Sequence, residues 1–314
     1  RCGAALAGAD PAPWRHQVLE LPKVQPTVVE YQRHRLVCGC GVSTCGALPA
    51  GVPESTAGPN LVAFVAVLMG CFRQSKRRVA LFLEQFLDVP CAAGWVVKLQ
   101  NQAAAALKPA YDELAAALPG QPRLNIDESP TKEGQTKAWL WTFVAPQFTV
   151  FAVRPTRAAT TLGELLTERF AGVVTCDRAK MYFRLKTLQW CWAHLQRDFQ
   201  ALIDFGDGVA KRLGHDLMRQ TKELFALWRR IRDGTLTRVG LKRKTAKLRG
   251  QVKGLLLRGL FSQRRPLVGM CRERLQHLPR LWTFLDQESV EPTNNAAEQA
   301  LRHPVIWRKL RFGT

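Results

Sequence analysis

The chain has 314 residues, 46% of them hydrophobic and nine of them tryptophan, which is enough for two or three domains with buried cores. Its formal net charge of +21 at pH 7 is typical of proteins that bind polyanions, such as nucleic acids or anionic membranes. The apolar run over residues 61–72 is shorter than the roughly 20 residues of a transmembrane helix, so no segment is expected to span a bilayer.

The nine cysteines are an odd number in a chain without an export signal, so a disulfide framework is not expected. Cysteines clustered near the start are more typical of metal ligands, and the scattered ones of buried thiols. The sequence starts at Arg1 without a methionine and stops at Thr314 without a tail. We therefore expect a fragment of a longer protein.

The first part of the chain is rich in glycine, proline and cysteine, which predicts a small irregular module over residues 1–58. Residues 27–37 form a short extended patch within it. A proline-containing linker then leads to the next region.

Residues 59–120 have the apolar spacing of helices. Residues 78–87 predict one amphipathic helix, Asp88-Val89-Pro90 ends it, and residues 92–107 resume. Three basic residues lie at the start of the first helix, namely Lys76, Arg77 and Arg78. Two short helices around a tight turn suit a helix-turn-helix that contacts DNA, although the spacing alone slightly favours an ordinary helical hairpin.

Short apolar runs follow, and they predict strands. Residues 123–126 lead to Asp127, and residues 138–144 and 148–153 predict a hairpin. A helix over residues 160–170 and a strand over residues 172–176, which leads to Asp177, come next. A strand over residues 187–192 precedes a helix from about His194.

This order of elements predicts an α/β fold with the mixed sheet and helices of a ribonuclease-H-like core, over residues 121–314. The stretch at about 201–290 is basic and helical, and it predicts an all-α insertion in that core. Pro292 ends the insertion, and a last helix carries Glu298.

Asp127 and Asp177 each end a predicted strand, so the two carboxylates converge if the strands are neighbours. An acid on a helix packed across the sheet would complete an oxygen-rich site for Mg²⁺ or Mn²⁺. Two such ions can support an in-line displacement at phosphorus.

Each acid also has an ordinary structural explanation. Aspartate after a strand is often a turn former or a helix cap. With Asn295 as N-cap, Glu298 falls at the capping-box position. Three further acids stand as alternatives on the residues alone: Glu128, Asp198 and Glu288.

Four blocks in a fixed order resemble a known family. They are Asn125-Ile126-Asp127-Glu128-Ser129 followed by residues 138–144, Cys176-Asp177 with Tyr182, Cys191-Trp192-Ala193-His194 continuing to Phe199, and Asn294-Asn295-Ala296-Ala297-Glu298 continuing to Arg302. Together they resemble the transposases of IS66-type insertion sequences. The resemblance covers almost all of the chain and implies a ribonuclease-H-like core of the DDE type.

The resemblance implies that Asp127, Asp177 and Glu298 are the catalytic acids and bind two Mg²⁺ or Mn²⁺ ions. His194, Arg197 and Arg302 become candidates for contacting DNA phosphate or orienting the site, although His194 is as often a structural cap. Asn294 either positions Glu298 or caps the last helix, and we favour the cap.

The family's N-terminal part implies a zinc-binding module before the helix-turn-helix, with Cys2, Cys38 and Cys40 as the candidate ligands. The one-residue spacing of Cys38 and Cys40 departs from the usual zinc knuckle, which predicts a degenerate module.

The implied activity is DNA transposition, that is, cleavage at the ends of an insertion element and joining of those ends to target DNA. The implied partners are the terminal repeats and the target, with a homo-oligomer assembled on DNA in a bacterial cytoplasm and no membrane partner. Two alternatives remain: a ribonuclease-H-like nuclease that only hydrolyses, and a non-catalytic DNA-binding remnant of a decayed transposase.

Overall fold

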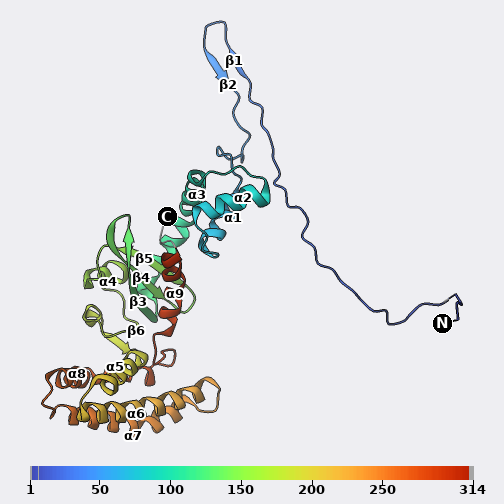
Figure 1. The fold of residues 1–314 in the computed structure, drawn as a ribbon. Helices are drawn as coiled ribbons and strands as arrows, with labels where there is room; N and C mark the ends of the chain where they lie inside the picture. Colours follow the sequence, from blue (N-terminus) through green and yellow to red (C-terminus); the bar gives the residue numbers. More distant parts are fainter. Residues whose placement is uncertain (1, 6, 311–314) are drawn as a thin grey trace. The chain divides into compact units, whose positions relative to one another are not determined.

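The computed structural model describes residues 2–5 and 7–310 (Figure 1). The chain divides into two compact units, one ending at Ala104 and the other beginning at Ala105. The predicted boundaries after residues 58 and 120 remain predictions. None of the described helices is both long and apolar enough to cross a membrane.

The first unit begins with an extended stretch in which the described residues before Arg35 form no helix or strand. Strands β1 (Arg35–Val37) and β2 (Ser43–Cys45) then pair as a small antiparallel hairpin. Only the end of the predicted extended patch over residues 27–37 is therefore a strand. The side chains of both strands are exposed, so no core fixes this module.

Three helices make the core of the first unit: α1 (Pro59–Gly70), α2 (Lys76–Leu87) and the start of α3 (Ala93–Ala116). The Ser75 hydroxyl accepts the Arg78 backbone N–H at 3.3 Å and so caps α2. Asp88 ends α2 in the left-handed conformation, which aspartate tolerates. The packed side chains include Val65, Val79, Leu83, Val96 and Leu99. The helices predicted for this region are confirmed.

The second unit is built on a five-stranded mixed sheet (Figure 1). Its strands are β3 (Arg123–Glu133), β4 (Thr136–Val144), β5 (Thr149–Arg154), β6 (Val173–Cys176) and β7 (Thr187–Trp190), in the order β5-β4-β3-β6-β7. The first three strands run antiparallel, whereas β6 pairs parallel with β3, and β7 with β6. Helix α4 (Ala159–Leu166) leads from β5 to β6. The mixed sheet is compatible with the predicted ribonuclease-H-like core.

Strand β3 is longer than the sequence predicts, because it continues through Asp127 to Glu133 instead of ending at Ile126. Each of its residues from Asn125 to Glu133 has a partner on β4, and Gly134 turns the hairpin at a φ of +59°. Pairing with β6 stops earlier, at Asn125. Asp127 therefore lies within a strand, just beyond the point where its neighbour β6 ends.

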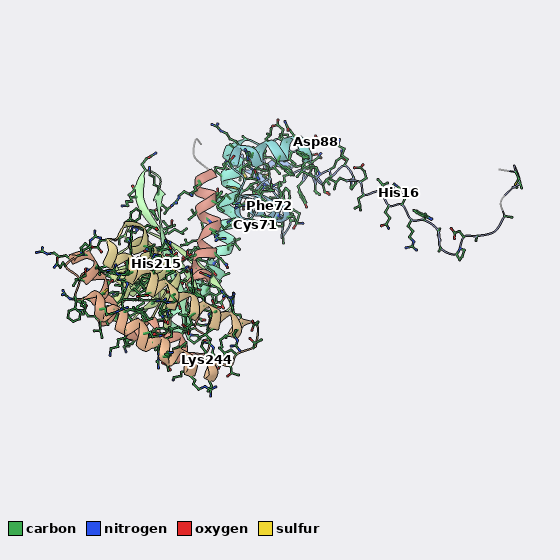
Figure 2. The ribbon with its side chains drawn as sticks, turned by 60° about the horizontal axis from the view of Figure 1, so that its bottom comes forward. His16, Cys71, Phe72, Asp88, His215 and Lys244 are labelled. Carbon is green, nitrogen blue, oxygen red and sulfur yellow. The ribbon has the colours of Figure 1, made fainter. Side chains whose placement is uncertain are left out.

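From β7 to the last helix the described chain is helical and contains no strand. The helices are α5 (Trp192–Phe205), α6 (Gly208–Arg232), α7 (Arg238–Gly259) and α8 (Arg265–Gln276), followed by two 3₁₀ turns. The basic run of α7 is solvent exposed, as Lys244 shows (Figure 2). Helix α9 (Asn295–Leu310) returns to the sheet and packs against β3 and β4.

Candidate active site

Strand β3 presents two consecutive acids to opposite faces of the sheet, because side chains alternate along a strand. Asn125 points toward α9, where its amide nitrogen donates to the Asn294 side-chain oxygen at 3.0 Å. Asp127, two residues on, shares that face. Glu128 points to the other face. Only Asp127 of the two can therefore meet an acid carried by α9.

Asp177 follows β6, and β6 lies next to β3, as the convergence of the two aspartates requires. The last parallel pair is Asn125 with Thr175. Extending that register by two residues puts Asp127 level with Asp177. The Oδ1 atom of Asp177 accepts the Ala179 backbone N–H at 2.7 Å, which fixes the loop after the strand.

Glu298 lies in the first turns of α9, but it does not form the predicted capping box. Its backbone N–H donates to the Asn294 carbonyl at 3.2 Å, so the helix begins one residue earlier than the capping box requires. Asn294 thus occupies the cap position, and Glu298 is the fourth helical residue instead of the third. The carboxylate of Glu298 is free to face the sheet and α5.

The Asn294 side chain connects α9 to β3. Its amide nitrogen donates to the Ile126 carbonyl at 2.8 Å, while its oxygen accepts from Asn125. The Asn294 backbone N–H donates to Cys191 Sγ at 3.1 Å, and the residue is fully buried. Asn294 therefore holds the start of α9, and with it Glu298, against β3 and the start of α5.

The three predicted acids interact electrostatically. Burial raises the pKa of Asp127 to about 7, and the negative charges of Glu128, Asp177 and Glu298 add to this effect. The Glu128 backbone N–H, which donates to Asp127 Oδ1 at 3.0 Å, opposes it only in part. Without a cation, Asp127 is therefore partly protonated near neutral pH.

Glu128 has a structural environment of its own on the opposite face. Its oxygens accept from the Tyr182 hydroxyl and from Arg157, each at 2.6 Å, and its side chain is only 4% exposed. The Arg157 guanidinium lies over the Trp139 ring, 4.9 Å from its centre. Because both of its oxygens have partners, Glu128 is not free to serve as a ligand.

Asp198 and Glu288, the other two alternative acids, also do not offer a free carboxylate at the candidate site. Asp198 Oδ2 pairs with Arg178 at 2.6 Å and with Arg274 at 2.7 Å. Both arginines also reach Glu273 on α8, and the Arg274 side chain is only 2% exposed. This network anchors the residue next to Asp177 to α5 and α8. Glu288 lies in an exposed loop.

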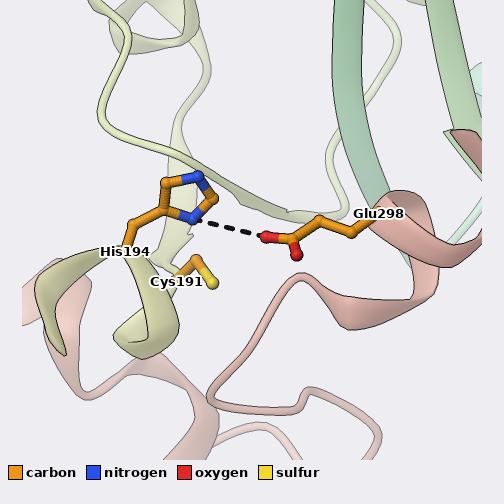
Figure 3. Close-up of side chains that lie close together, drawn as sticks. All are labelled: Cys191, His194 and Glu298. Atoms are coloured by element: carbon orange, nitrogen blue, oxygen red, sulfur yellow. Dashed lines mark ion pairs between the residues drawn. The ribbon is translucent and has the colours of Figure 1, made fainter. Parts of the chain in front are cut away.

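Two basic residues of α5 lie beside Glu298. His194 Nδ1 lies 3.6 Å from Glu298 Oε1 (Figure 3). Arg197 Nη2 lies 3.5 Å from the same oxygen. Burial lowers the pKa of His194, and the neighbouring Arg197 charge lowers it further, so the imidazole is neutral at pH 7. Both residues therefore lie next to the Glu298 carboxylate itself. Arg302, one turn further along α9, is exposed.

Cys191 was missed as a candidate ligand, although it belongs to the quoted Cys-Trp-Ala-His segment. Ligand atoms of Cys191, His194 and Glu298 all lie within 4.8 Å of one another, the only such group among the described residues. The Cys-x-x-His spacing at the start of a helix was the signal that could have found it.

The predicted zinc ligands of the first unit are not brought together in the part of the chain that the structure describes. Cys2, Cys38 and Cys40 are all exposed, and they form no three-ligand group. Hydrogen bonds from Cys40 lower the pKa of the Cys38 thiol. Lys76, Arg77 and Arg78 lie at the start of α2 in the same unit.

Replacing Asn294 with alanine should lower the free energy of unfolding by about 2–4 kcal/mol. The change leaves the Asn125 amide and the Ile126 carbonyl buried without their partner, and each such group costs about 1–3 kcal/mol. Urea denaturation measures the change, with Asn295→Ala at the exposed neighbouring position as the control. Equal stabilities of the two variants would disprove the anchoring role.

Comparison with known proteins agrees with the geometry. The family model described as "Transposase IS66 family" matches residues 54–313. A comparison with curated proteins found no match. Because the family model covers most of the chain, including all three acids, the chain belongs to the IS66 family of transposases.

Proposed function

We propose that the protein is a metal-dependent transposase in which Asp127, Asp177 and Glu298 hold two Mg²⁺ or Mn²⁺ ions. It would cleave DNA at the ends of an insertion element and join the freed ends to target DNA. The observation that carries this proposal is the strand register, which sets Asp127 of β3 level with Asp177 after β6, together with the packing of α9, the helix of Glu298, against β3.

The donor set fits hard divalent cations. The three carboxylates of Asp127, Asp177 and Glu298, which we call the acidic centre, offer six oxygens, and oxygen ligands are the ones that Mg²⁺ and Mn²⁺ prefer. Burial raises the pKa of Asp127, the neighbouring negative charges raise it further, and a bound cation would relieve that repulsion. When bound, two such ions activate a water or a 3′-hydroxyl and stabilise the leaving oxygen.

The protein's own residues supply rigidity and charge. Asp127 is fixed within β3, Asp177 by its turn at the end of β6, and Glu298 by the Asn294 contacts at the start of α9. Arg197 pairs with Glu298 from the α5 side at 3.5 Å, and His194 lies beside the same carboxylate. Arg197 and Arg302 are both solvent accessible and would meet the phosphates of bound DNA.

DNA binding follows from the family, and we assign part of it to two basic surfaces. Lys76, Arg77 and Arg78 lie at the start of α2, which has no acid in its first turn, so positive charge gathers at this helix end. The exposed basic run of α7, residues 242–249, is the second surface. Cutting both ends of one element would require at least two copies of the chain.

With DNA carrying the element's terminal repeats, cleaved and joined products should form in Mg²⁺ or Mn²⁺ and should disappear in EDTA. The metal dependence follows from the role of the three carboxylates, which cannot stabilise a developing negative charge by themselves. Product analysis on denaturing gels measures both steps, with DNA of scrambled ends as the control.

The same assay separates the alternatives. Nicked product without joined product would identify a nuclease that only hydrolyses. Metal-independent DNA binding without either product would identify a non-catalytic DNA-binding protein. Either result would overturn the proposed function.

A further inference from the structure

Three side chains with different ligand chemistry meet beside the acidic centre. Cys191 begins α5, His194 lies one turn further on, and Glu298 reaches across from α9 (Figure 3). One ligand atom from each lies within 4.8 Å of the others. Helix α5 thus brings a sulfur and a nitrogen to an acid that also belongs to the acidic centre.

The spacing suits a small tetrahedral ion. With metal–ligand bonds of about 2.0–2.3 Å, neighbouring ligand atoms of a tetrahedral zinc site lie about 3.3–3.8 Å apart. His194 Nδ1 and Glu298 Oε1 are already 3.6 Å apart. The remaining atoms need to close by about 1.5 Å at most, which side-chain rotation can supply.

Two of the three atoms lack a strong partner. His194 Nδ1 is buried and makes no hydrogen bond, since 3.6 Å to Glu298 is too long for one. A buried polar atom without a partner is costly and uncommon in folded proteins. Glu298 Oε1 has only two long contacts, at 3.5 and 3.6 Å. A metal ion between these atoms would satisfy both.

The Cys191 sulfur already has one backbone donor, because Sγ accepts the Asn294 backbone N–H at 3.1 Å. Burial raises the pKa of the Cys191 thiol, and the backbone N–H groups of Asn294, His194 and Ala193 oppose this only in part. A bound metal would displace the thiol proton to solvent, and these donors would then stabilise the thiolate. The nitrogen ligand would be His194 Nδ1, a buried atom without a hydrogen-bond partner.

We propose that Cys191, His194 and Glu298 form a site for one Zn²⁺-class ion, with its fourth position open. Thiolate and imidazole select zinc over Mg²⁺, and three protein ligands with an open position differ from a closed structural site. Because Glu298 is shared, zinc here competes with the metal ions of the acidic centre. That consequence rests on the proposed function, whereas zinc binding itself does not.

Titration of the full chain with Co²⁺, a spectroscopic substitute for Zn²⁺, tests the site. A thiolate ligand gives Co²⁺ a charge-transfer absorption in the near ultraviolet. We expect Cys191→Ser and His194→Gln each to remove one component of that absorption and to weaken Co²⁺ binding at this site by at least about 100-fold, since losing even a second-shell partner of a metal costs about 10–100-fold.

The control is Cys271→Ser, which alters a buried thiol of α8 that belongs to no ligand group among the described residues. It should keep the full absorption, and absorption from exposed cysteines is common to all variants and cancels in difference spectra. His194→Gln leaves the thiol in place, so its effect does not depend on packing at Cys191. A spectrum unchanged in either site variant overturns the proposal, whether or not DNA is cleaved.

Discussion

Replacing Glu298 with glutamine should lower the rate of strand transfer at saturating Mg²⁺ by about 10³-fold or more. Metal ions stabilise the transition state of such displacements by several kcal/mol, and about 4 kcal/mol corresponds to a change of about 10³-fold in rate. Glutamine keeps the size of the side chain and its place on α9 but removes the charge. Single-turnover joining of pre-cleaved element ends measures the rate.

The matched control is Glu291→Gln, in the exposed loop before α9, which should keep the parent rate. DNA binding by Glu298→Gln should remain close to that of the parent, because phosphate contacts come from basic residues. Parent-like joining by Glu298→Gln would remove this residue from the catalytic acids and leave Asp127 and Asp177 without their proposed third partner.

Replacing Asp127 with asparagine should stabilise the metal-free protein at pH 8 by up to about 4 kcal/mol and leave its stability nearly unchanged at pH 4. Asp127 titrates at about 7 in the folded chain and near 3.9 in an unfolded one, and each unit of difference is worth about 1.4 kcal/mol. Asparagine cannot ionise, and its side-chain oxygen can still accept the Glu128 backbone N–H.

The direction of this stability change follows from the raised pKa of Asp127. The folded chain binds the Asp127 proton more tightly than the unfolded chain does, so this contribution is complete below about pH 4 and is lost as the pH rises through 7. Thermal or urea unfolding of parent and variant across this range measures the difference. Asp204→Asn, at an exposed position of α5, is the control.

Divalent metal should narrow the stability difference between parent and variant at pH 8. At about 100 times its dissociation constant, Mg²⁺ would add about 2.7 kcal/mol to the parent at pH 8 and much less to Asp127→Asn. A parent–variant difference that stays constant from pH 4 to pH 8 would show that the pKa of Asp127 is not raised in the folded chain.

Much of the fold could be predicted from the sequence, because its signals are local. Ser75 at the start of α2 and the Asp88-Val89-Pro90 stop define that helix within a few residues. The turn before Phe148 marks the β4–β5 hairpin, and the apolar run before Asp177 marks β6. The helical run after β7 follows from its apolar spacing and its lack of β-branched segments.

The features that were missed depend on contacts between distant residues. The end of β3 is set by its partner β4, since Pro130 and the charged residues near it resemble a loop when read alone. The capping box at Glu298 is locally plausible, but Asn294 starts the helix instead, and its side chain bonds across the sheet. No pattern within α9 contains that information.

Strand geometry decides which of the adjacent acids, Asp127 or Glu128, faces α9. Asp127 and Glu128 are equivalent as sequence, and once β3 is known to continue, alternation separates them. Arg157 and Tyr182, which donate hydrogen bonds to the Glu128 carboxylate, come from other parts of the chain. Family resemblance favours Asp127, the residue of the pair that shares a face of β3 with Asn125 and therefore with α9, and its catalytic role stays a prediction.

The hydrogen bond between Asn125 and Asn294 joins residues 169 positions apart. During synthesis, β3 leaves the ribosome long before α9 exists, so one face of the sheet must wait uncovered while the whole helical stretch is made. A nascent chain therefore holds two of the three acids without the third for most of its translation. Completion of the acidic centre is tied to the last described helix, so under the proposed function a half-made chain could not yet cleave DNA.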